Sequence, residues 1–336
     1  MTTTLALFAV AALMGSVAGI PLARARWAGH APRLAVALWH ALCFGVVSSV
    51  VLGGLALALP VLPQVITGGL SDFLARCAMA LHTELAAPRP AFLGAAGLLL
   101  ALAAGTRLLR GLMAAAREAK RGRRHQLDRL TLVGHLLPSD HRERLVLLDD
   151  ARPAAYCLPG RRRGRATIVI SRGALELLGD DQVDLLLAHE RAHLRQRHHL
   201  ATRLTAALTT SFGWVPLFRL ASGQVPLLLE MAADDEAVRL TTRRHSAQTT
   251  ARRRLADAVV NLATAQTPTP AAAFSAAGGS ALARVQRLSR PPERLGLAHT
   301  TLLTAGVGVI LAGPLLVATA PVLCAAAMDI CPIALA

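Results

Sequence analysis

The chain alternates between four long apolar runs and segments rich in charged and polar residues. These runs predict a mainly α membrane protein with four transmembrane helices, at residues 4–22, 34–62, 90–110 and 299–323. The first run has no charged side chain and would span about 28 Å as a helix, enough for the hydrocarbon core of a membrane. The last run contains Pro314, which a membrane helix tolerates as a kink.

Basic residues beside the runs predict how the chain crosses the membrane. A cleaved secretory signal would carry its positive charge before the apolar stretch, whereas Arg24, Arg26 and Arg33 follow the first run, so we expect a retained helix. By the positive-inside rule, this loop and the arginine-rich segment after the third run should be cytoplasmic. We therefore expect a multi-pass protein of the cell membrane with both termini outside.

The predicted domains are a membrane region, a cytoplasmic domain, the last helix and a short outside tail, at 1–116, 117–298, 299–323 and 324–336. In the cytoplasmic domain, residues 155–158 and 167–171 are typical of two strands around a turn-like PGRRRG segment, and a helical pattern follows. This order predicts an α+β domain. The free edge of such a hairpin could hold an extended peptide or could merely support the helix after it.

The residue pattern predicts a role for two further segments of the domain. Residues 204–220 are apolar and broken near Gly213 and Pro216, so they are either an arm of a buried helical hairpin or a segment lying against the bilayer. Residues 281–295 carry four arginines and read as a basic amphipathic entry into the last helix.

Composition supports a membrane protein rather than a nucleic-acid-binding one. The chain is 54% hydrophobic, has a mean hydropathy of +0.46 and carries a net charge of +16. Its basic residues lie beside apolar runs and accompany no recognised nucleic-acid motif, which favours attraction to anionic lipid. No direct nucleic-acid partner is expected. Cys157 has no CxxC partner, as in a reducing compartment, whereas Cys324 and Cys331 could pair outside.

A metal-binding pattern lies in the segment LLLAHERAHLRQRHHL. In an α-helix, His189 and His193 are one turn apart and can present two imidazole nitrogens to one metal ion. Glu190 borders the same face, where it can take a proton from a water molecule at the metal. Gly179 and the acidic residues after it predict where this helix begins. The pattern indicates a zinc hydrolase, but a third ligand is needed.

Two residues could supply that third ligand. His199 would fit an extended pattern only if the chain left the helix near Gln196, where Gly is expected; in a continuous helix it points away. Glu230, on a second helix, gives a His/His/Glu site with one open position for water. Asp234 lies four residues further on and could orient a ligand. We favour Glu230 over a merely solvated acidic face because HExxH accompanies it.

These residues resemble the membrane-embedded zinc peptidases of the BlaR/MecR type. The resemblance rests on the stretch from Ala155 to Leu200, on FGWVPL after it, on EMAAD from Glu230, and on the order of three spans, a peptidase domain and a final span. It implies a gluzincin-like zinc peptidase domain that cleaves a protein substrate, such as a transcriptional repressor. Heat-shock and prenyl-protein membrane proteases share HExxH with a later ExxxD, so a quality-control protease is the alternative.

One departure from the resemblance concerns sensing. The β-lactam sensors carry a large extracellular penicillin-binding domain, whereas only a short tail follows the last run here, so we do not expect antibiotic sensing by such a domain. Carried over by residue, the resemblance implies Zn²⁺ ligands at His189, His193 and Glu230, a general base at Glu190 and a supporting acid at Asp234. A non-catalytic signalling scaffold that keeps the metal for structure is a further alternative.

Overall fold

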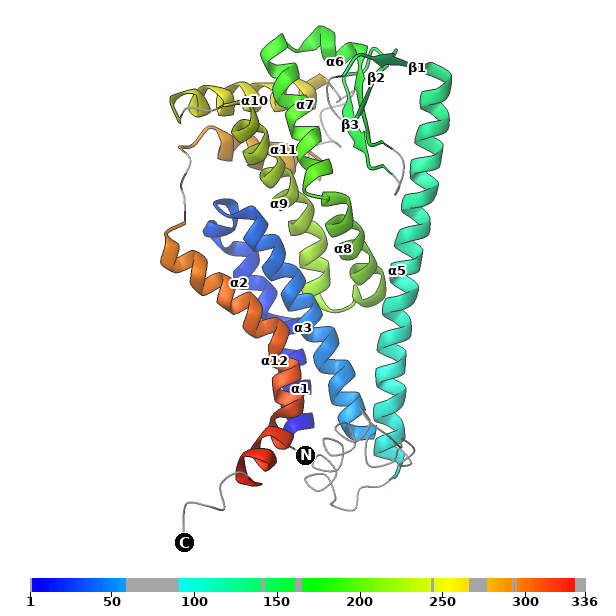
Figure 1. Ribbon diagram of the computed structural model, residues 1–336, viewed down its shortest axis with the longest axis vertical. Helices are drawn as coiled ribbons and strands as arrows, with labels where there is room; N and C mark the ends of the chain where they lie inside the picture. The colour runs from blue at the N-terminus through cyan, green and yellow to red at the C-terminus, as the bar shows by residue number, and fades with distance from the viewer. Residues whose placement is uncertain are drawn as a thin grey trace.

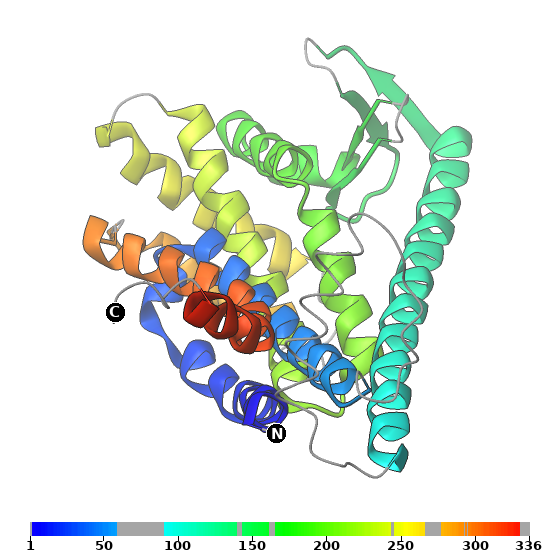
Figure 2. The same ribbon diagram turned by 60° about the horizontal axis from the view of Figure 1, so that its bottom comes forward.

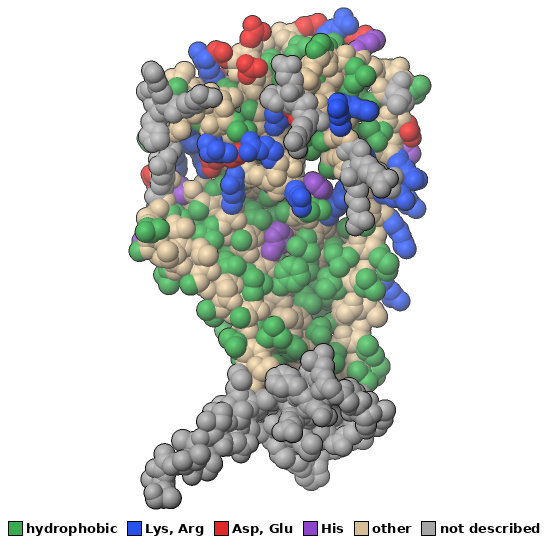
Figure 3. All heavy atoms as spheres, viewed as in Figure 1, with side chains coloured by type: hydrophobic (Ala, Val, Ile, Leu, Met, Phe, Trp, Pro, Cys, Tyr) green, Lys and Arg blue, Asp and Glu red, His purple; other side chains and the backbone are tan. Residues whose placement is uncertain are grey.

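The computed structural model describes residues 2–58, 91–139, 143–160, 165–242, 245–265, 277–291, 293 and 295–329. Apolar helices form one end of the molecule, and a small sheet with further helices forms the other (Figure 1). Hydrophobic side chains cover the first end, while charged side chains gather on the second (Figure 3). The division follows the alternation of apolar and polar segments in the sequence.

Among the described residues, the apolar end contains four helices that are long and apolar enough to cross a membrane. The first is built from α1 (Thr2–Leu13), a π-helical segment η1 (Met14–Ala18) and α2 (Gly19–Arg24), followed by a short 3₁₀ turn η2 (Arg26–Gly29). The others are α3 (Pro32–Ala58), α5 (Ala91–Val133) and α12 (Leu297–Asp329). Helices α1 and α12 pack on one side of α3 and α5 on the other (Figure 2).

Helix α5 is longer than the span predicted at 90–110. It is a single helix of 43 residues, about 65 Å long at 1.5 Å per residue, whose apolar first part continues without a break into its basic part. Gly111 allows it to cross α8 closely, because a Cβ there would lie 2.1 Å from Ser211 Oγ. The predicted span at 34–62 ends within the described residues at Ala58, and the segment 59–90 lies outside them.

A four-stranded sheet follows α5 along the chain. Its strands are β1 (Gly134–Leu137), β2 (Arg144–Leu148), β3 (Ala155–Leu158) and β4 (Thr167–Ser171), in the order β1-β2-β4-β3. Strands β3 and β4 form the predicted antiparallel hairpin, and β2 runs parallel to β4. Strand β1 was not predicted, because it follows α5 with Gly134 as its only break.

Two capped helices follow the sheet. Ser171 caps α6 (Arg172–Leu177) by accepting a hydrogen bond from the Ala174 amide, and α7 (Asp180–Arg195) begins after Gly179 with two acidic residues in its first turn. Leu186 and Leu187 pack α7 against Ile168 and Ile170 of β4. The helix predicted to carry HExxH is therefore fixed on the sheet.

Helices α8 (His198–Phe212) and α9 (Pro216–Thr241) form a hairpin that reaches down between α3 and α5. Phe212, Leu217 and Phe218 are buried in a cluster with Trp39 of α3. Residues 204–220 therefore contribute to a helical hairpin whose apolar face packs into this cluster.

Helices α10 (His245–Ala265) and α11 (Ala277–Leu288) complete the charged end. The predicted entry helix at 281–295 is wrong in its extent and role: α11 ends at Leu288, separate from α12, and Arg284 and Arg287 bond to carboxylates of α9. Basic residues at helical spacing are compatible with either a lipid surface or acidic partners, and the tertiary fold supplies the acidic partners.

Candidate metal centre

Helix α7 presents His189, Glu190 and His193 toward α9. Its opposite flank is fixed by packing on the sheet, and Leu185 and Ala188 pack with Ala237 and Val238 of α9. His189 is 4% exposed and Glu190 is 8% exposed, so the first half of the motif is removed from bulk solvent. The one-turn spacing in the sequence thus becomes one side of a buried site.

Three potential ligand atoms converge between α7 and α9. The Nε2 atoms of His189 and His193 are 3.0 Å apart, and the Glu230 carboxylate lies 3.3 Å from the first and 3.4 Å from the second. Tetrahedral zinc ligands at about 2.0–2.1 Å from the ion would be separated by about 3.3 Å. Two imidazoles and a carboxylate at these separations fit a zinc ion.

Asp234 and Arg284 support this group from behind. Asp234 is fully buried, and its Oδ1 lies 2.9 Å from Nδ1 of His189, the nitrogen that faces away from Glu230. Arg284 of α11 donates to both oxygens of Asp234, at 2.9 and 2.6 Å, and its Nη1 lies 3.1 Å from Oε2 of Glu230. The bidentate pair fixes the carboxylate that fixes the His189 ring.

A backbone break after α7 places His198 behind the second histidine. Arg197 has φ 53°, the left-handed conformation, which turns the chain so that α8 begins at His198. His198 is 5% exposed, and its Nδ1 lies 2.9 Å from Nδ1 of His193. The chain thus leaves the helix at Arg197, although Gln196 stands where the extended pattern expects Gly. The break brings His198, and not His199, to the site.

His199 lines a cavity next to the site instead of joining the three converging ligand atoms. This cavity of about 410 Å³ is bordered by His193 and Glu230 on one side and by Cys157 and Pro159, at the end of β3, on the other. The described residues therefore place an open space between the candidate ligands and the sheet.

Electrostatics keep the carboxylates of the site ionised. Burial would raise the pKa of Glu230, but its hydrogen bond to His189 and the charges of His189 and Arg284 outweigh burial and lower the pKa to about 2. Burial also opposes ionisation of Asp234, yet Arg284 and His189 hold its pKa well below the usual range. Burial would lower the pKa of His189, but its hydrogen bonds to Asp234 and Glu230 outweigh burial and raise the pKa to about 10.

Glu190 has a different environment. Burial is the main cause that raises its pKa, while the charge of His189 and a hydrogen bond with the Cys157 thiol oppose the shift. A carboxylate with a raised pKa beside the two histidines is suited to accept a proton and to release it again. The structure thus brings together all five residues singled out from the sequence: Glu190, His189, His193, Glu230 and Asp234.

Arg284 and His198 were not identified as site residues from the sequence. Arg284 is 54 positions after Glu230, and its only sequence signal was its place in a basic helix. His198 directly precedes the candidate His199 in the sequence, and in a continuous helix it would point away from His193.

A HExxH helix with a downstream Glu and Asp on a second helix, in a chain with long apolar helices, defines a membrane-type zinc metallopeptidase. The model of Peptidase family M48 matches residues 123–292, about half of the chain, so the chain belongs to this family of zinc metallopeptidases. The match includes the sheet and helices α6 to α11.

Two curated relatives carry the name Protease HtpX homolog. The one from Aquifex aeolicus is 31% identical over 72 residues, which is 21% of this chain and 24% of the relative. The one from Acidiphilium cryptum is 31% identical over 90 residues, or 27% of this chain and 30% of the relative. The chain thus matches less than a third of the length of either relative. No solved structure matches it.

Proposed function

We propose that the chain is an integral membrane zinc endopeptidase that cleaves a protein substrate at the cytoplasmic face. The observation that carries the proposal is the convergence of His189, His193 and Glu230 between α7 and α9, with Glu190 beside them. Membership of a zinc metallopeptidase family supports the reaction class. The open cavity next to the ligands supports catalysis over a purely structural metal, which would be enclosed.

Each residue of the site has a role in this proposal. His189, His193 and Glu230 would hold Zn²⁺, which when bound would supply polarisation of a scissile carbonyl and a more acidic water. Glu190 accepts a proton from the attacking water and returns it to the leaving amine, for which its buried position and raised pKa are suited. Asp234 holds His189 in one ring orientation, and Arg284 holds Asp234.

The edge of the sheet offers a place for the substrate backbone. Strand β3 lies at the end of the sheet order, pairs with β4 along one side and borders the cavity at Cys157. An extended peptide added along its other side would be held by backbone hydrogen bonds, largely independent of side-chain sequence. This arrangement would bring a peptide bond next to the candidate ligands, because Cys157 lines the same cavity as His193 and Glu230.

We propose that the four apolar helices cross the membrane with the peptidase domain, 117–298, in the cytoplasm and both termini outside. The basic side chains gather above the hydrophobic lower half of the molecule, as the positive-inside rule expects (Figure 3). Labelling of Cys157 by an impermeant reagent from outside intact cells would overturn this orientation.

Two substrate classes follow from the proposal. The resemblance to BlaR/MecR-type peptidases favours regulated cleavage of a soluble protein such as a transcriptional repressor. The similarity to relatives named Protease HtpX homolog favours the second class, membrane proteins degraded in quality control. A cytoplasmic repressor would reach the sheet edge from the solvent, whereas a membrane protein would reach it from the bilayer side.

The experiment compares wild-type cells with cells that express Glu190→Gln. The variant keeps all three proposed ligands but cannot accept the proton, so it should retain zinc and lose activity by about 10²- to 10⁴-fold. Proteomics should show full-length substrates that accumulate in the variant, and their membrane or soluble character separates the two classes. Glu176→Gln, an exposed change on α6, is the matched control. Cleavage of an identified substrate by Glu190→Gln at the wild-type rate would refute the mechanism. If neither the wild type nor Glu190→Gln showed measurable cleavage and the variant still signalled fully in cells, the non-catalytic signalling scaffold would be favoured.

A further inference from the structure

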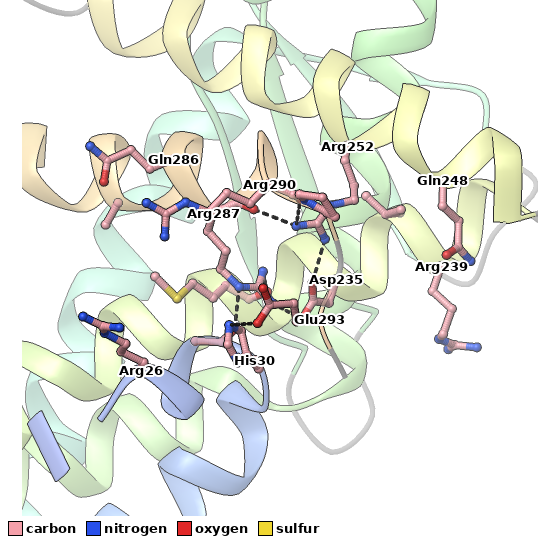
Figure 4. Close-up of a pocket in the computed structure, with 15 residues that line it drawn as sticks. Arg26, His30, Asp235, Arg239, Gln248, Arg252, Gln286, Arg287, Arg290 and Glu293 are labelled. Carbon is pink, nitrogen blue, oxygen red and sulfur yellow. Dashed lines mark hydrogen bonds and ion pairs between the residues drawn. The ribbon is translucent and has the colours of Figure 1, made fainter. Parts of the chain in front are cut away.

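A second cavity, away from the metal centre, lies between the loop after the first apolar helix and helices α9, α10 and α11. It has a volume of about 880 Å³. Figure 4 shows Arg26 of η2 and Arg239 of α9 on opposite sides of it, with Arg252, Arg287 and Arg290 between them. The cavity is therefore built from segments far apart in the sequence, and the feature that its walls share is arginine.

The charges of this cavity do not balance. Five arginines line it, of which Arg239 pairs with Glu236 outside the lining, against the carboxylates of Asp235 and Glu293. Asp235 bonds to Arg287 and lies 3.5 Å from Arg252, and Glu293 lies 3.3 Å from His30. Within the part of the chain that the structure describes, the guanidinium groups of Arg26 and Arg290 have no acidic partner. An excess of positive charge is left facing the space.

Arg252 adds a donor that is buried at the cavity wall. Its side chain is 8% exposed, and its Nη2 donates to the carbonyl of Arg287 at 2.8 Å. Its Nε has no hydrogen-bond partner among the described residues, although it is removed from solvent. The bond to the Arg287 carbonyl holds the guanidinium group of Arg252 at the wall, where its positive charge attracts an anion.

We propose that this cavity binds a phosphate group. A phosphate offers several acceptor oxygens to guanidinium groups that approach from different directions, and arginine is the side chain that matches it in shape. The metal centre contributes none of the groups used here, so the proposal does not depend on peptidase activity.

The position of the cavity allows two sources of phosphate. Residues 26–30 connect two helices that are apolar enough to cross a membrane, so the cavity lies where the hydrophobic surface gives way to the basic surface (Figure 3). An anionic phospholipid headgroup could reach it from the bilayer. A free phosphate could reach it from the solvent, and the chemistry of recognition is the same for both.

The test measures thermal unfolding of the full-length protein. Inorganic phosphate is titrated in detergent, against sodium chloride at matched ionic strength. In parallel, the protein is placed in nanodiscs of phosphatidylcholine alone and of an equal mixture with phosphatidylglycerol. We compare the wild type with Arg26→Gln/Arg290→Gln, which removes the two unpaired guanidinium groups without breaking an ion pair. Arg253→Gln, an exposed neighbour of Arg252 outside the cavity, is the matched control.

The wild type and the control should show a saturable rise in melting temperature. The double variant should need an about 30-fold higher ligand concentration to reach the same rise, because it loses two basic residues at roughly 1 kcal/mol each and about 1.4 kcal/mol corresponds to a factor of ten. A response to phosphatidylglycerol alone identifies the lipid headgroup, and a response to phosphate identifies the free anion. Equal responses in the wild type and the double variant, or no response to either probe, would overturn the proposal.

Discussion

Helix α9 has two halves that meet different surroundings. The half from Pro216 to Val225 packs into the apolar cluster, where Leu217, Phe218 and Val225 are at most 1% exposed. The other half carries Glu230, Asp234, Asp235 and Glu236, each of which lies near an arginine. Pro226 lies between the halves, and the helix continues through it.

The difference shows how two kinds of interaction can share one rigid element. Apolar packing fixes the first half. The unfolding free energy lost when one of its side chains is truncated depends on the volume of the cavity that remains. Directed contacts of charged groups fix the second half, and the cost there depends on which partner remains unpaired. Because a helix transmits its position along its length, the apolar cluster holds Glu230 at the height of His189 and His193. The following predictions test whether the first half of α9 mainly stabilises the fold and the second half mainly holds the metal centre.

The largest effect is expected from Glu230→Ala in the polar half. It removes one of three proposed protein ligands, so tightly bound zinc should be lost while the helix stays folded. Metal analysis of the purified protein and circular dichroism check both parts. Glu176→Ala on the exposed side of α6 should keep its zinc. One equivalent of zinc in Glu230→Ala would remove this residue from the ligand set and reopen the case for His199.

Phe218→Ala should have the opposite signature in the apolar half. Phe218 is 1% exposed and its ring centroid lies 5.4 Å from that of Phe212, so truncation leaves a cavity that should cost about 3 kcal/mol of unfolding free energy. Zinc stoichiometry of the folded protein should not change. Thermal unfolding and metal analysis measure the two quantities, with Phe44→Ala, at a 38% exposed site of α3, as the control. Loss of zinc together with stability would contradict the separation of the halves.

Asp234→Asn should weaken the metal centre without abolishing it. The amide can still contact His189 but loses the charge that pairs with Arg284, so we expect zinc affinity and activity to fall by about 10- to 100-fold. Competition with a chelator gives the affinity. Asp184→Asn, exposed on α7, should match the wild type. An unchanged zinc affinity in Asp234→Asn would mean that the carboxylate serves the fold and not the ligand.

The smallest effect is expected at Glu236, which joins the polar half of α9 to the start of α3. Its carboxylate accepts from Arg239 and Arg33, each at 2.9 Å, and the bond from Arg239 is the main cause that lowers its pKa below the usual value of 4.5. A lowered pKa in the folded state stabilises the protein fully above the unfolded pKa, and the gain is lost as pH falls through the folded value.

Glu236→Gln should therefore lower the unfolding free energy by about 1–2 kcal/mol near neutral pH, and by progressively less below about pH 4.5. Chemical unfolding of both proteins across this range gives the difference. A difference that stayed constant down to strongly acidic pH would show that packing, not charge, holds Glu236.

Sequence alone determined the elements whose signal is local. Apolar runs gave the long helices, alternation around PGRRRG gave β3 and β4, and the acidic start after Gly179 gave α7. Side chains four residues apart in a helix point in nearly the same direction. The face that α7 presents therefore had to carry His189 and His193 together, with Glu190 at its border, wherever the helix lay in the fold. The choice of Glu230 and Asp234 came from the same periodicity on a second helix, and both lie at the site.

Only the tertiary structure decided which distant groups meet. Arg284 reaches Asp234 because α11 folds back over α9. His198 reaches His193 because Arg197 adopts a left-handed backbone conformation, which an arginine in the sequence does not predict. Strand β1 and the full length of α5 likewise depend on what packs against them. Such contacts join residues that are distant in the sequence. The spacing of arginines along a helix does not show whether a phosphate, a lipid or a buried carboxylate will bind them, because a guanidinium group can pair with all three.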